Sequence, residues 1–290
     1  MAFVVEQQDR SGWVALRDTS SGSSVVVAPE RGALVRSFVV GGRELLYLDE
    51  ATFADAQKNV RGGIPVLFPS PGRLHEDRWQ RDGRSGAMKQ HGFARNAAWQ
   101  VAGSSAATAA RVDLVLRSDA QLQQQFPWQF RVELRFALKG STLRIESSVE
   151  NLDTAPMPYA FGFHPYFAVP DKASATVVTN ATRAYNNVTK GAGAFTGFDF
   201  LSPEVDVHLQ DHSLAVCDLQ IAGVGAVRLR ASQGFRRWVV WALQDKPFIC
   251  VEPWTAGGDA LNTGELLQYV APKEIAREWV EMSWIDADTA

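Results

Sequence analysis

One histidine stands inside an apolar and aromatic run, Gly162-Phe163-His164-Pro165-Tyr166-Phe167. Pro165 has no backbone N–H and fixes its own φ, so a strand that reaches His164 is expected to end there. Pro165 also favours an extended conformation at His164. An imidazole aimed out of an apolar wall is a candidate acid or base, because its ordinary pKa of about 6.5 lies near neutral pH. A core histidine bonded to a backbone carbonyl is the alternative for this hexapeptide alone.

A carboxylate at the end of an apolar strand is the second candidate. Glu252 follows Phe248-Ile249-Cys250-Val251 and precedes Pro253-Trp254. Burying an unpaired carboxylate costs free energy, so such a residue is usually ion-paired or functional, with a raised pKa that suits a general base. Glu265 and Glu274 are competing acids. We prefer Glu252 because it ends an apolar strand, whereas Glu274 fits a turn before the last strand.

Polar and aromatic loop residues could bind a ligand beside this pair. In Arg61-Gly62-Gly63 the glycines allow close backbone approach, and Arg61 could donate a fork of hydrogen bonds. His91, next to Gly92, has open access on one side. Among the nine tryptophans, Trp254 is the best candidate for stacking on a sugar ring, because it lies in a loop directly after Glu252. A surface arginine and a solvated loop histidine are the alternatives for Arg61 and His91.

The elements that must position these residues are short strands. Apolar and polar residues alternate with a period of two through much of the chain, which is typical of half-buried strands. The clearest are 36–40 and 43–48 around Gly41-Gly42, 111–116, 131–138 and 143–151 around Gly140-Ser141, 227–230, and 279–284. Helical turns are expected only at 49–57 and 120–125, and residues 61–95, 185–203 and 253–265 do not read as strands. This pattern predicts an all-β sandwich or barrel with few short helices, formed by residues 1–290 as a single domain.

Composition narrows the function classes. The chain has 290 residues, a net charge of −3 and a pI of about 6.0. It therefore lacks the excess of basic residues typical of proteins that bind nucleic acid or an anionic membrane. Cys217 and Cys250 lie in apolar strand-like runs and are expected to be reduced core residues of a cytoplasmic protein. The first residues lack a signal-peptide pattern, no run approaches a membrane span, and no cluster has metal-ligand spacing.

Taken together, these pieces resemble the aldose 1-epimerases, or galactose mutarotases, and their glucose-6-phosphate 1-epimerase relatives. The resemblance covers nearly the whole chain, and the order and spacing of its pieces are more specific than any one of them. The pieces are Gly32-Ala33-Leu34, Leu46-Tyr47, Arg61-Gly62-Gly63-Ile64-Pro65, His91-Gly92-Phe93-Ala94-Arg95, Asn151, Met157-Pro158, Gly162 to Phe167 and Val251-Glu252-Pro253.

The resemblance implies a large antiparallel β-supersandwich with a shallow sugar groove, and interconversion of the α and β anomers of an aldose. It implies that Glu252 takes the proton of the C1 hydroxyl and that His164 protonates the ring oxygen. It also implies that Arg61 and His91 bind sugar hydroxyls, and that Asp206, in a weaker local motif, lies where the family has a sugar-binding aspartate. No cofactor or metal is implied.

The resemblance leaves the substrate and one other function class open. Arg61, Lys89 and Arg95 could serve a phosphate-handling branch, whereas Arg73, Arg78, Arg81 and Arg84 could equally form a solvated loop. We therefore expect a small-molecule sugar or sugar phosphate as the partner of a monomer or weak homodimer. A non-catalytic carbohydrate-binding or sensor protein on the same fold is the alternative, since sites are grafted onto folds. A binder has no need for His164 and Glu252 to converge on one groove.

Overall fold

The computed structural model of the chain describes residues 2–8 and 12–287. The α-helices in this part of the chain are short: α1 (Glu50–Ala54), α2 (Ala120–Gln125) and α3 (Ala260–Thr263). Asp49 and Asp119 cap the first two helices, because each carboxylate accepts a backbone N–H three residues on. The helical turns predicted at 49–57 and 120–125 are thus confirmed. None of the helices in the described ranges is long and apolar enough to cross a bilayer.

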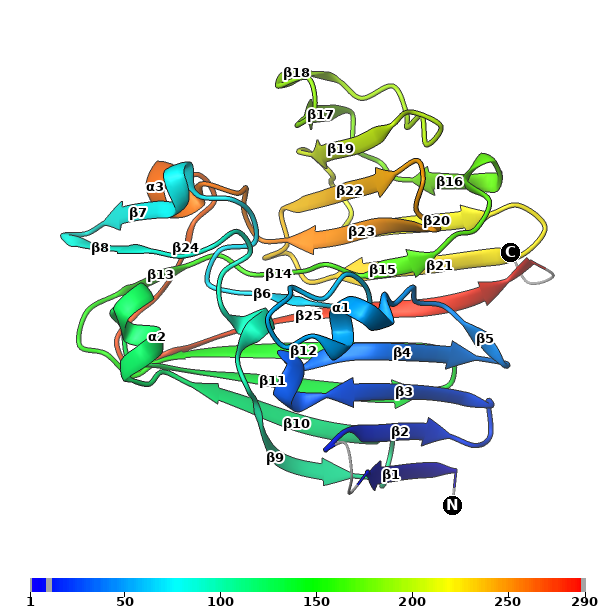
Figure 1. The fold of residues 1–290 in the computed structure, drawn as a ribbon, viewed down its shortest axis with the longest axis horizontal. Helices are drawn as coiled ribbons and strands as arrows, with labels where there is room; N and C mark the ends of the chain where they lie inside the picture. The colour runs from blue at the N-terminus through cyan, green and yellow to red at the C-terminus, as the bar shows by residue number, and fades with distance from the viewer. Residues whose placement is uncertain (1, 9–11, 288–290) are drawn as a thin grey trace.

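Antiparallel β-strands make up most of the structure (Figure 1). One sheet runs β1 (Phe3–Gln7), β2 (Val14–Asp18), β3 (Ser23–Ala28), β4 (Leu34–Val40), β5 (Arg43–Glu44). A second runs β16 (Ala175–Val178), β20 (Val216–Ile221), β21 (Gly225–Ala231), β25 (Ile275–Asp286), β12 (Thr142–Asn151), β11 (Phe130–Lys139), β10 (Ala110–Arg117), β9 (Gln100–Ser105).

A third sheet carries the candidate site. Its strand order is β18 (Gly191–Ala194), β17 (Arg183–Asn186), β19 (Glu204–Leu209), β22 (Arg237–Leu243), β23 (Phe248–Trp254), β14 (Gly162–Phe163) and β6 (Val66–Leu67). A further strand, β15 (Tyr166–Ala168), also pairs with β23. Two small pairs, β13 (Met157–Tyr159) with β24 (Gln268–Val270) and β7 (Arg78–Arg81) with β8 (Arg84–Ala87), complete the strands.

One large apolar core joins the three main sheets. In Figure 1 the sheet of β1 to β5 lies in front of β10 to β12, and β2 and β3 contact β10 and β11. Side chains of the third sheet, such as Val240 and Val251, belong to the same buried cluster as Leu229 and Met282 of the second. This architecture is the predicted all-β supersandwich. Because the core runs from Val14 to Trp284, it supports our proposal that residues 1–290 form a single domain.

Strict alternation in the sequence identified the central strands well. In β11 and β12, buried and partly buried residues alternate along all ten positions of each strand, and Gly140-Ser141 makes the turn between them. Cys217 in β20 and Cys250 in β23 are buried free thiols, as predicted. The strand predicted at 43–48 is shorter than expected, because only Arg43 and Glu44 pair with β4 and the chain then crosses to bridge Leu46 with Phe167.

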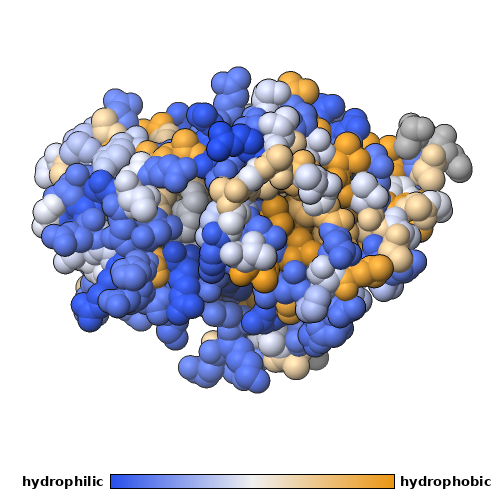
Figure 2. All heavy atoms as spheres, turned by 90° about the horizontal axis from the view of Figure 1, so that it is seen from above, coloured by the Kyte–Doolittle hydropathy of each residue, from blue (hydrophilic) through white to orange (hydrophobic). Residues whose placement is uncertain are grey.

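The prediction that three long segments lack strands is wrong in part. Residues 61–95 contain β6 and the hairpin of β7 and β8, and residues 185–203 contain β18. In β18 all four residues, Gly-Ala-Gly-Ala, are exposed, so no buried face imposes an apolar period of two. Only 253–265 is free of further strands after β23 ends, and it holds α3 instead. Figure 2 shows that the end of the molecule carrying the β7–β8 hairpin is mainly hydrophilic.

Asn151 fixes the path from β12 to the strands that carry the site. Its fully buried amide donates to the carbonyls of Ala155 and Val270, both at 2.8 Å, and its oxygen accepts the Asp153 N–H at 2.9 Å. An alanine here would leave these three backbone groups without their partner, and buried unpaired groups are costly.

We expect Asn151→Ala to lower the free energy of unfolding by about 3 kcal/mol, measured by urea denaturation. Asn180→Ala is the matched control, since the Asn180 side chain is exposed and its amide donates to the Ser213 hydroxyl at 2.8 Å. A control change within about 0.5 kcal/mol is expected. Equal losses in the two variants would contradict the anchoring role of Asn151.

Candidate active site

The candidate site is built where Pro165 interrupts a strand. β14 ends at Phe163 and β15 begins at Tyr166, so His164 lies between two short strands that both pair with β23. The backbone remains anchored there, because His164 N–H donates to the Pro65 carbonyl at 3.0 Å. The predicted strand end at His164 is thus confirmed.

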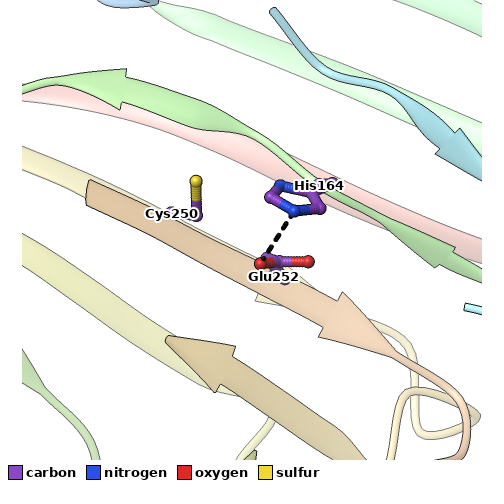
Figure 3. Close-up of side chains that lie close together, drawn as sticks. All are labelled: His164, Cys250 and Glu252. Atoms are coloured by element: carbon purple, nitrogen blue, oxygen red, sulfur yellow. Dashed lines mark ion pairs between the residues drawn. The ribbon is translucent and has the colours of Figure 1, made fainter. Parts of the chain in front are cut away.

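Glu252 lies directly opposite this histidine. It comes from β23 and is 1% exposed, while His164 is 5% exposed. His164 Nε2 lies 3.4 Å from Glu252 Oε1, the contact drawn as a dashed line in Figure 3. The two residues predicted to carry the chemistry therefore converge. That convergence was the feature expected of an enzyme and not required of a binding protein.

Aromatic rings fix the orientation of His164. Tyr166 stacks on the imidazole with a centroid distance of 4.6 Å and an angle of 9° between the planes. Trp241 and His91 meet the same ring edge-on at 5.8 and 5.4 Å. Phe167 does not take part: it is 1% exposed and belongs to the main core, since successive strand residues face opposite sides. The imidazole is thus held by packing, with one edge directed at Glu252.

Burial pushes both members of the pair toward their neutral forms. Desolvation lowers the pKa of His164 well below its ordinary value, and the nearby His91 and Arg95 act in the same direction. Desolvation raises the pKa of Glu252 well above its ordinary value, and the Asp206 charge adds to this effect. A hydrogen bond from Trp254 and the Arg95 charge act in the opposite direction on Glu252. Such perturbed groups are typical of catalytic sites.

His91 faces the pair in an unusual backbone conformation. Its φ is +74°, and the following Gly92 packs so closely that a Cβ there would lie 2.2 Å from the Phe68 carbonyl oxygen. Because Nδ1 donates to the Pro71 carbonyl, Nε2 of the neutral ring is left as an acceptor. Burial lowers the pKa of His91 to about 3, and Arg95 contributes to the shift. His91 is therefore a neutral hydrogen-bonding group at ordinary pH.

Two arginines bring positive charge to the same place. Arg95 is 8% exposed and donates to the Val60 carbonyl at 2.8 Å. Burial lowers the pKa of its guanidinium, but an arginine pKa is ordinarily so high that the group stays protonated. Arg61 is exposed and lies 5.9 Å from the centre of the Trp241 ring. The predicted close approach at Gly62 is confirmed, since a Cβ there would lie 2.5 Å from the Leu48 Cα.

Asp206 lines the same cavity from β19, together with its partners. Asp206 Oδ2 accepts from the Asn187 amide at 2.6 Å, and Oδ1 lies 3.4 Å from His208 Nε2. Burial alone would raise the pKa of Asp206, but the bonds from His208 and Asn187 outweigh it and leave the pKa below its ordinary value. Asp206 therefore brings a negative charge to the cavity. His208 could have been found from the sequence, because residues two apart in a strand share a face.

A cavity of about 680 Å³ connects these side chains. All seven predicted site residues line it: Arg61, His91, Arg95, His164, Asp206, Glu252 and Trp254. Sequence reasoning did not single out several other lining residues: Asn59, Tyr185, Asn187, Glu204, His208, Gln210, Arg237 and Trp241. Most of these come from β17, β19 and β22. In the sequence of such strands, a polar residue that lines a cavity cannot be told from a polar residue that faces solvent.

Trp254 lines the cavity in a different way from the one expected. It is 4% exposed, which leaves little of the ring face for stacking on a sugar. Its indole N–H donates to Glu252 Oε2 at 3.0 Å. Trp241 is the less buried of the two rings, and its N–H donates to Glu204 at 3.0 Å. Trp241 is therefore the better placed platform for a sugar face.

The competing acids and loop arginines have other partners. Glu265 lies at the cavity rim and pairs with Arg237 at 2.6 Å, and Glu274 lies in the turn just before β25. Arg81 donates to the Leu261 and Asn262 carbonyls, and Arg84 pairs with Asp153. Arg73 lines the cavity with its side chain 73% exposed, whereas Lys89 is not among the described residues that line it. Arg81 and Arg84 thus hold the loops together.

One group of side chains has donor atoms of the kinds that bind a metal. His164, Cys250 and Glu252 each offer an atom within 4.8 Å of the others, although their sequence spacing gave no sign of it (Figure 3). Cys250 and Glu252 are two apart on β23 and share a face. Cys250 packs in an apolar cluster with Tyr166 and Phe248, and burial raises its thiol pKa. The charges of Arg61 and Arg95 at the site oppose a cation, so we assign no metal role to this group.

Comparison with known proteins gives a consistent result. The sequence profile of the family described as aldose 1-epimerase matches residues 15–215. A relative from Cenchrus ciliaris, named "Putative glucose-6-phosphate 1-epimerase", is 31% identical over 240 residues, which cover 73% of this chain and 69% of the relative.

Two solved structures share the whole architecture. The Slr1438 protein from Synechocystis is 33% identical, with a TM-score of 0.93 over 99% of this chain and 100% of the other. A galactose mutarotase-like protein from Clostridium acetobutylicum is 19% identical, with a TM-score of 0.84 over 98% of each chain. The second likeness bears on the fold alone, and it agrees with the predicted galactose mutarotase-like sandwich.

The buried carboxyl of Glu252 should make stability depend on pH. Its folded-state pKa is raised above the ordinary 4.5, so the folded protein holds a proton that the unfolded chain has already released. Wild type should therefore lose stability relative to Glu252→Gln as pH rises above 4.5, by up to about 1.4 kcal/mol per pH unit. Urea denaturation of both proteins from about pH 4 to about pH 9 measures this difference in the free energy of unfolding. A difference that is constant over the range would contradict the raised pKa.

Proposed function

The chain belongs to the aldose 1-epimerase family of isomerases, and we propose that it interconverts the α and β anomers of an aldose or an aldose 6-phosphate. One observation supports this proposal above the others: the 3.4 Å separation of His164 Nε2 and Glu252 Oε1 on the cavity. In a cyclic aldose the hydroxyl oxygen O1 and the ring oxygen O5 are both bonded to C1. An acid and a base this close can address two oxygens of one carbon.

In the proposed reaction Glu252 takes the proton of the C1 hydroxyl while His164 gives a proton to O5. The C1–O5 bond breaks, and an open-chain aldehyde with a hydroxyl at C5 forms. Rotation about C1–C2 presents the other face of the aldehyde. Ring closure then reverses both transfers: His164 recovers its proton from O5, and Glu252 returns one to O1. No atom or electron is gained or lost, so the cycle needs no cofactor.

The pair shares one proton throughout this cycle. Before ring opening the proton is on His164, and after it the proton is on Glu252. Burial favours the second, uncharged arrangement, as the opposite pKa shifts of the two residues indicate. The environment thus favours the products of the ring-opening proton transfer, while the Arg95 charge keeps the ionised carboxylate of Glu252 accessible.

The remaining residues serve to bind and orient the sugar. Arg61 donates hydrogen bonds, and the neutral His91 accepts one at Nε2. Asp206, held ionised by Asn187 and His208, accepts hydrogen bonds from sugar hydroxyls. Arginine side chains that line the cavity could pair with a 6-phosphate, but carboxyl side chains line it too and Arg237 is already paired with Glu265, so both the free sugar and its 6-phosphate stay in the proposal. The name of the Cenchrus ciliaris relative points to the 6-phosphate.

We expect His164→Ala and Glu252→Gln each to reduce the catalysed rate of anomerisation by about 10²- to 10⁴-fold, the usual contribution of one positioned acid or base. Nuclear magnetic resonance exchange spectroscopy on the α and β signals of glucose, galactose and their 6-phosphates measures this rate at equilibrium. Glu274→Gln is the matched control, since this rival acid lies in a turn that does not line the cavity. It should retain wild-type activity.

Two results would contradict the proposal. The first is a wild-type protein that accelerates the exchange of none of these sugars above the buffer rate. The second is full activity in either active-site variant, with circular dichroism showing an unchanged fold. Comparing the wild-type rates on the free sugars and the 6-phosphates identifies the substrate class.

A further inference from the structure

A tryptophan side chain is bonded to the proposed base. The Trp254 indole N–H donates to Glu252 Oε2 at 3.0 Å, and the other carboxylate oxygen, Oε1, faces His164 at 3.4 Å. Both residues lie on β23 two positions apart, so their side chains leave the same face of the sheet. Each oxygen of the carboxylate thus has a separate partner.

Glycines, which have no side chain, make room for this indole. A Cβ on Gly162, at the start of β14, would lie 2.7 Å from Trp254 Cδ1. A Cβ on Gly72 would lie 3.0 Å from Cζ3 of the same ring and 2.5 Å from the Gly258 Cα. Real Cβ atoms do not approach as closely as 2.7 Å, so the ring requires glycine at position 162, whereas at position 72 glycine is required mainly by the Gly258 backbone that lines the same slot. The indole therefore occupies a slot that the backbone forms from three segments distant in sequence.

Neighbouring rings close this slot. His91 and His208 meet the Trp254 ring edge-on, with centroid distances of 6.1 and 5.4 Å and interplanar angles of 78° and 88°. With 4% of its surface exposed, the ring has little freedom to turn. Its N–H is thus aimed at Glu252 by packing, and it would otherwise be a buried donor without a partner.

We propose that Trp254 is a positioning residue: its indole N–H holds Oε2 of Glu252 so that Oε1 remains directed at His164 and the sugar. The inference rests on the proposed function for its effect on turnover, but the hydrogen bond itself can be tested without any sugar. It replaces the stacking role that the sequence suggested for this tryptophan. It also gives a physical reason for the glycine two residues before His164.

The hydrogen bond has an electrostatic consequence as well. The other charged and titratable groups around Glu252 come from several elements: His164 after β14, Tyr166 on β15, Asp206 on β19, Cys250 on β23 and Arg95 in the Ala94–Asn96 turn. Of these, Asp206 disfavours the carboxylate and Arg95 favours it. The Trp254 N–H favours it too, because it donates to the ionised form. Loss of the N–H should make Glu252 a carboxylic acid over a wider pH range.

The test compares Trp254→Phe with Trp238→Phe. Trp238 is a suitable control because it is a buried tryptophan on the adjacent strand β22, and its N–H has no hydrogen-bond partner among the described residues. The pKa of Glu252 is measured from the pH dependence of its ¹³Cδ chemical shift. The signal is assigned by comparison with the spectrum of Glu252→Gln, which lacks it. We expect Trp254→Phe to raise the titration midpoint by about one pH unit or more, the equivalent of one hydrogen bond to a charged group. Trp238→Phe should leave it unchanged.

Turnover provides the second measurement. Trp254→Phe should lower kcat about tenfold or more and change KM less than about twofold, because the bond acts on the base and not on the sugar. Gly162→Ala keeps the indole N–H but displaces the ring, so it should raise the Glu252 midpoint in the same direction. This variant tests the inference even if Trp254→Phe does not fold.

The possible outcomes separate the two proposals. An unchanged Glu252 midpoint and kcat in Trp254→Phe, with wild type active, would overturn the role of Trp254 and leave the epimerase function standing. A wild type that accelerates no anomerisation would overturn the function, while a raised midpoint in Trp254→Phe would still support the hydrogen bond. Equal effects in Trp254→Phe and Trp238→Phe would show a general packing effect and contradict the inference.

Discussion

The site depends on an imidazole and a carboxyl group buried side by side. His164 and Glu252 are 5% and 1% exposed, and their nearest polar atoms lie 3.4 Å apart. Removing both groups from water disfavours the ionised forms, so the surrounding residues must keep the pair able to exchange a proton. Arg95 and Trp254 do this for Glu252, and the stacked ring of Tyr166 holds His164 in place. In the proposed reaction, proton transfer would then need little rearrangement, which suits a reaction that runs in both directions.

The β-supersandwich supplies this arrangement with its backbone. β23 is buried along its whole length and presents Cys250, Glu252 and Trp254 on one face. The short strands β14 and β15 pair with it on either side of Pro165, which leaves His164 opposite Glu252. Figure 3 shows the result, with the two side chains meeting between neighbouring strands. The distance between His164 and Glu252 is thus set by β23 and by the two short strands that flank His164.

Much of this could be predicted from the sequence, for identifiable reasons. Strands such as β11 and β12 have one buried and one partly buried face, so their residues alternate, and Pro165 marks a strand end because it lacks a backbone N–H. The exposed strand β18 has no such signal. The family resemblance supplied the roles of His164 and Glu252, and the structure brings both to one cavity. The contacts of His208 with Asp206 and of the Trp254 N–H with Glu252 join residues two apart on one strand, so the sequence places each pair on one face, but the bond itself depends on side-chain rotamers that a single sequence does not specify.

The most direct measurement of the central claim is a crystal structure of the Glu252→Gln variant with a bound aldose or aldose 6-phosphate. We expect the sugar to lie in the cavity of about 680 Å³ with O1 against the side chain at position 252 and O5 against His164 Nε2. Both contacts should fall within hydrogen-bond distance, about 3.2 Å or less. A sugar bound with its C1–O5 bond away from these two residues would contradict the account.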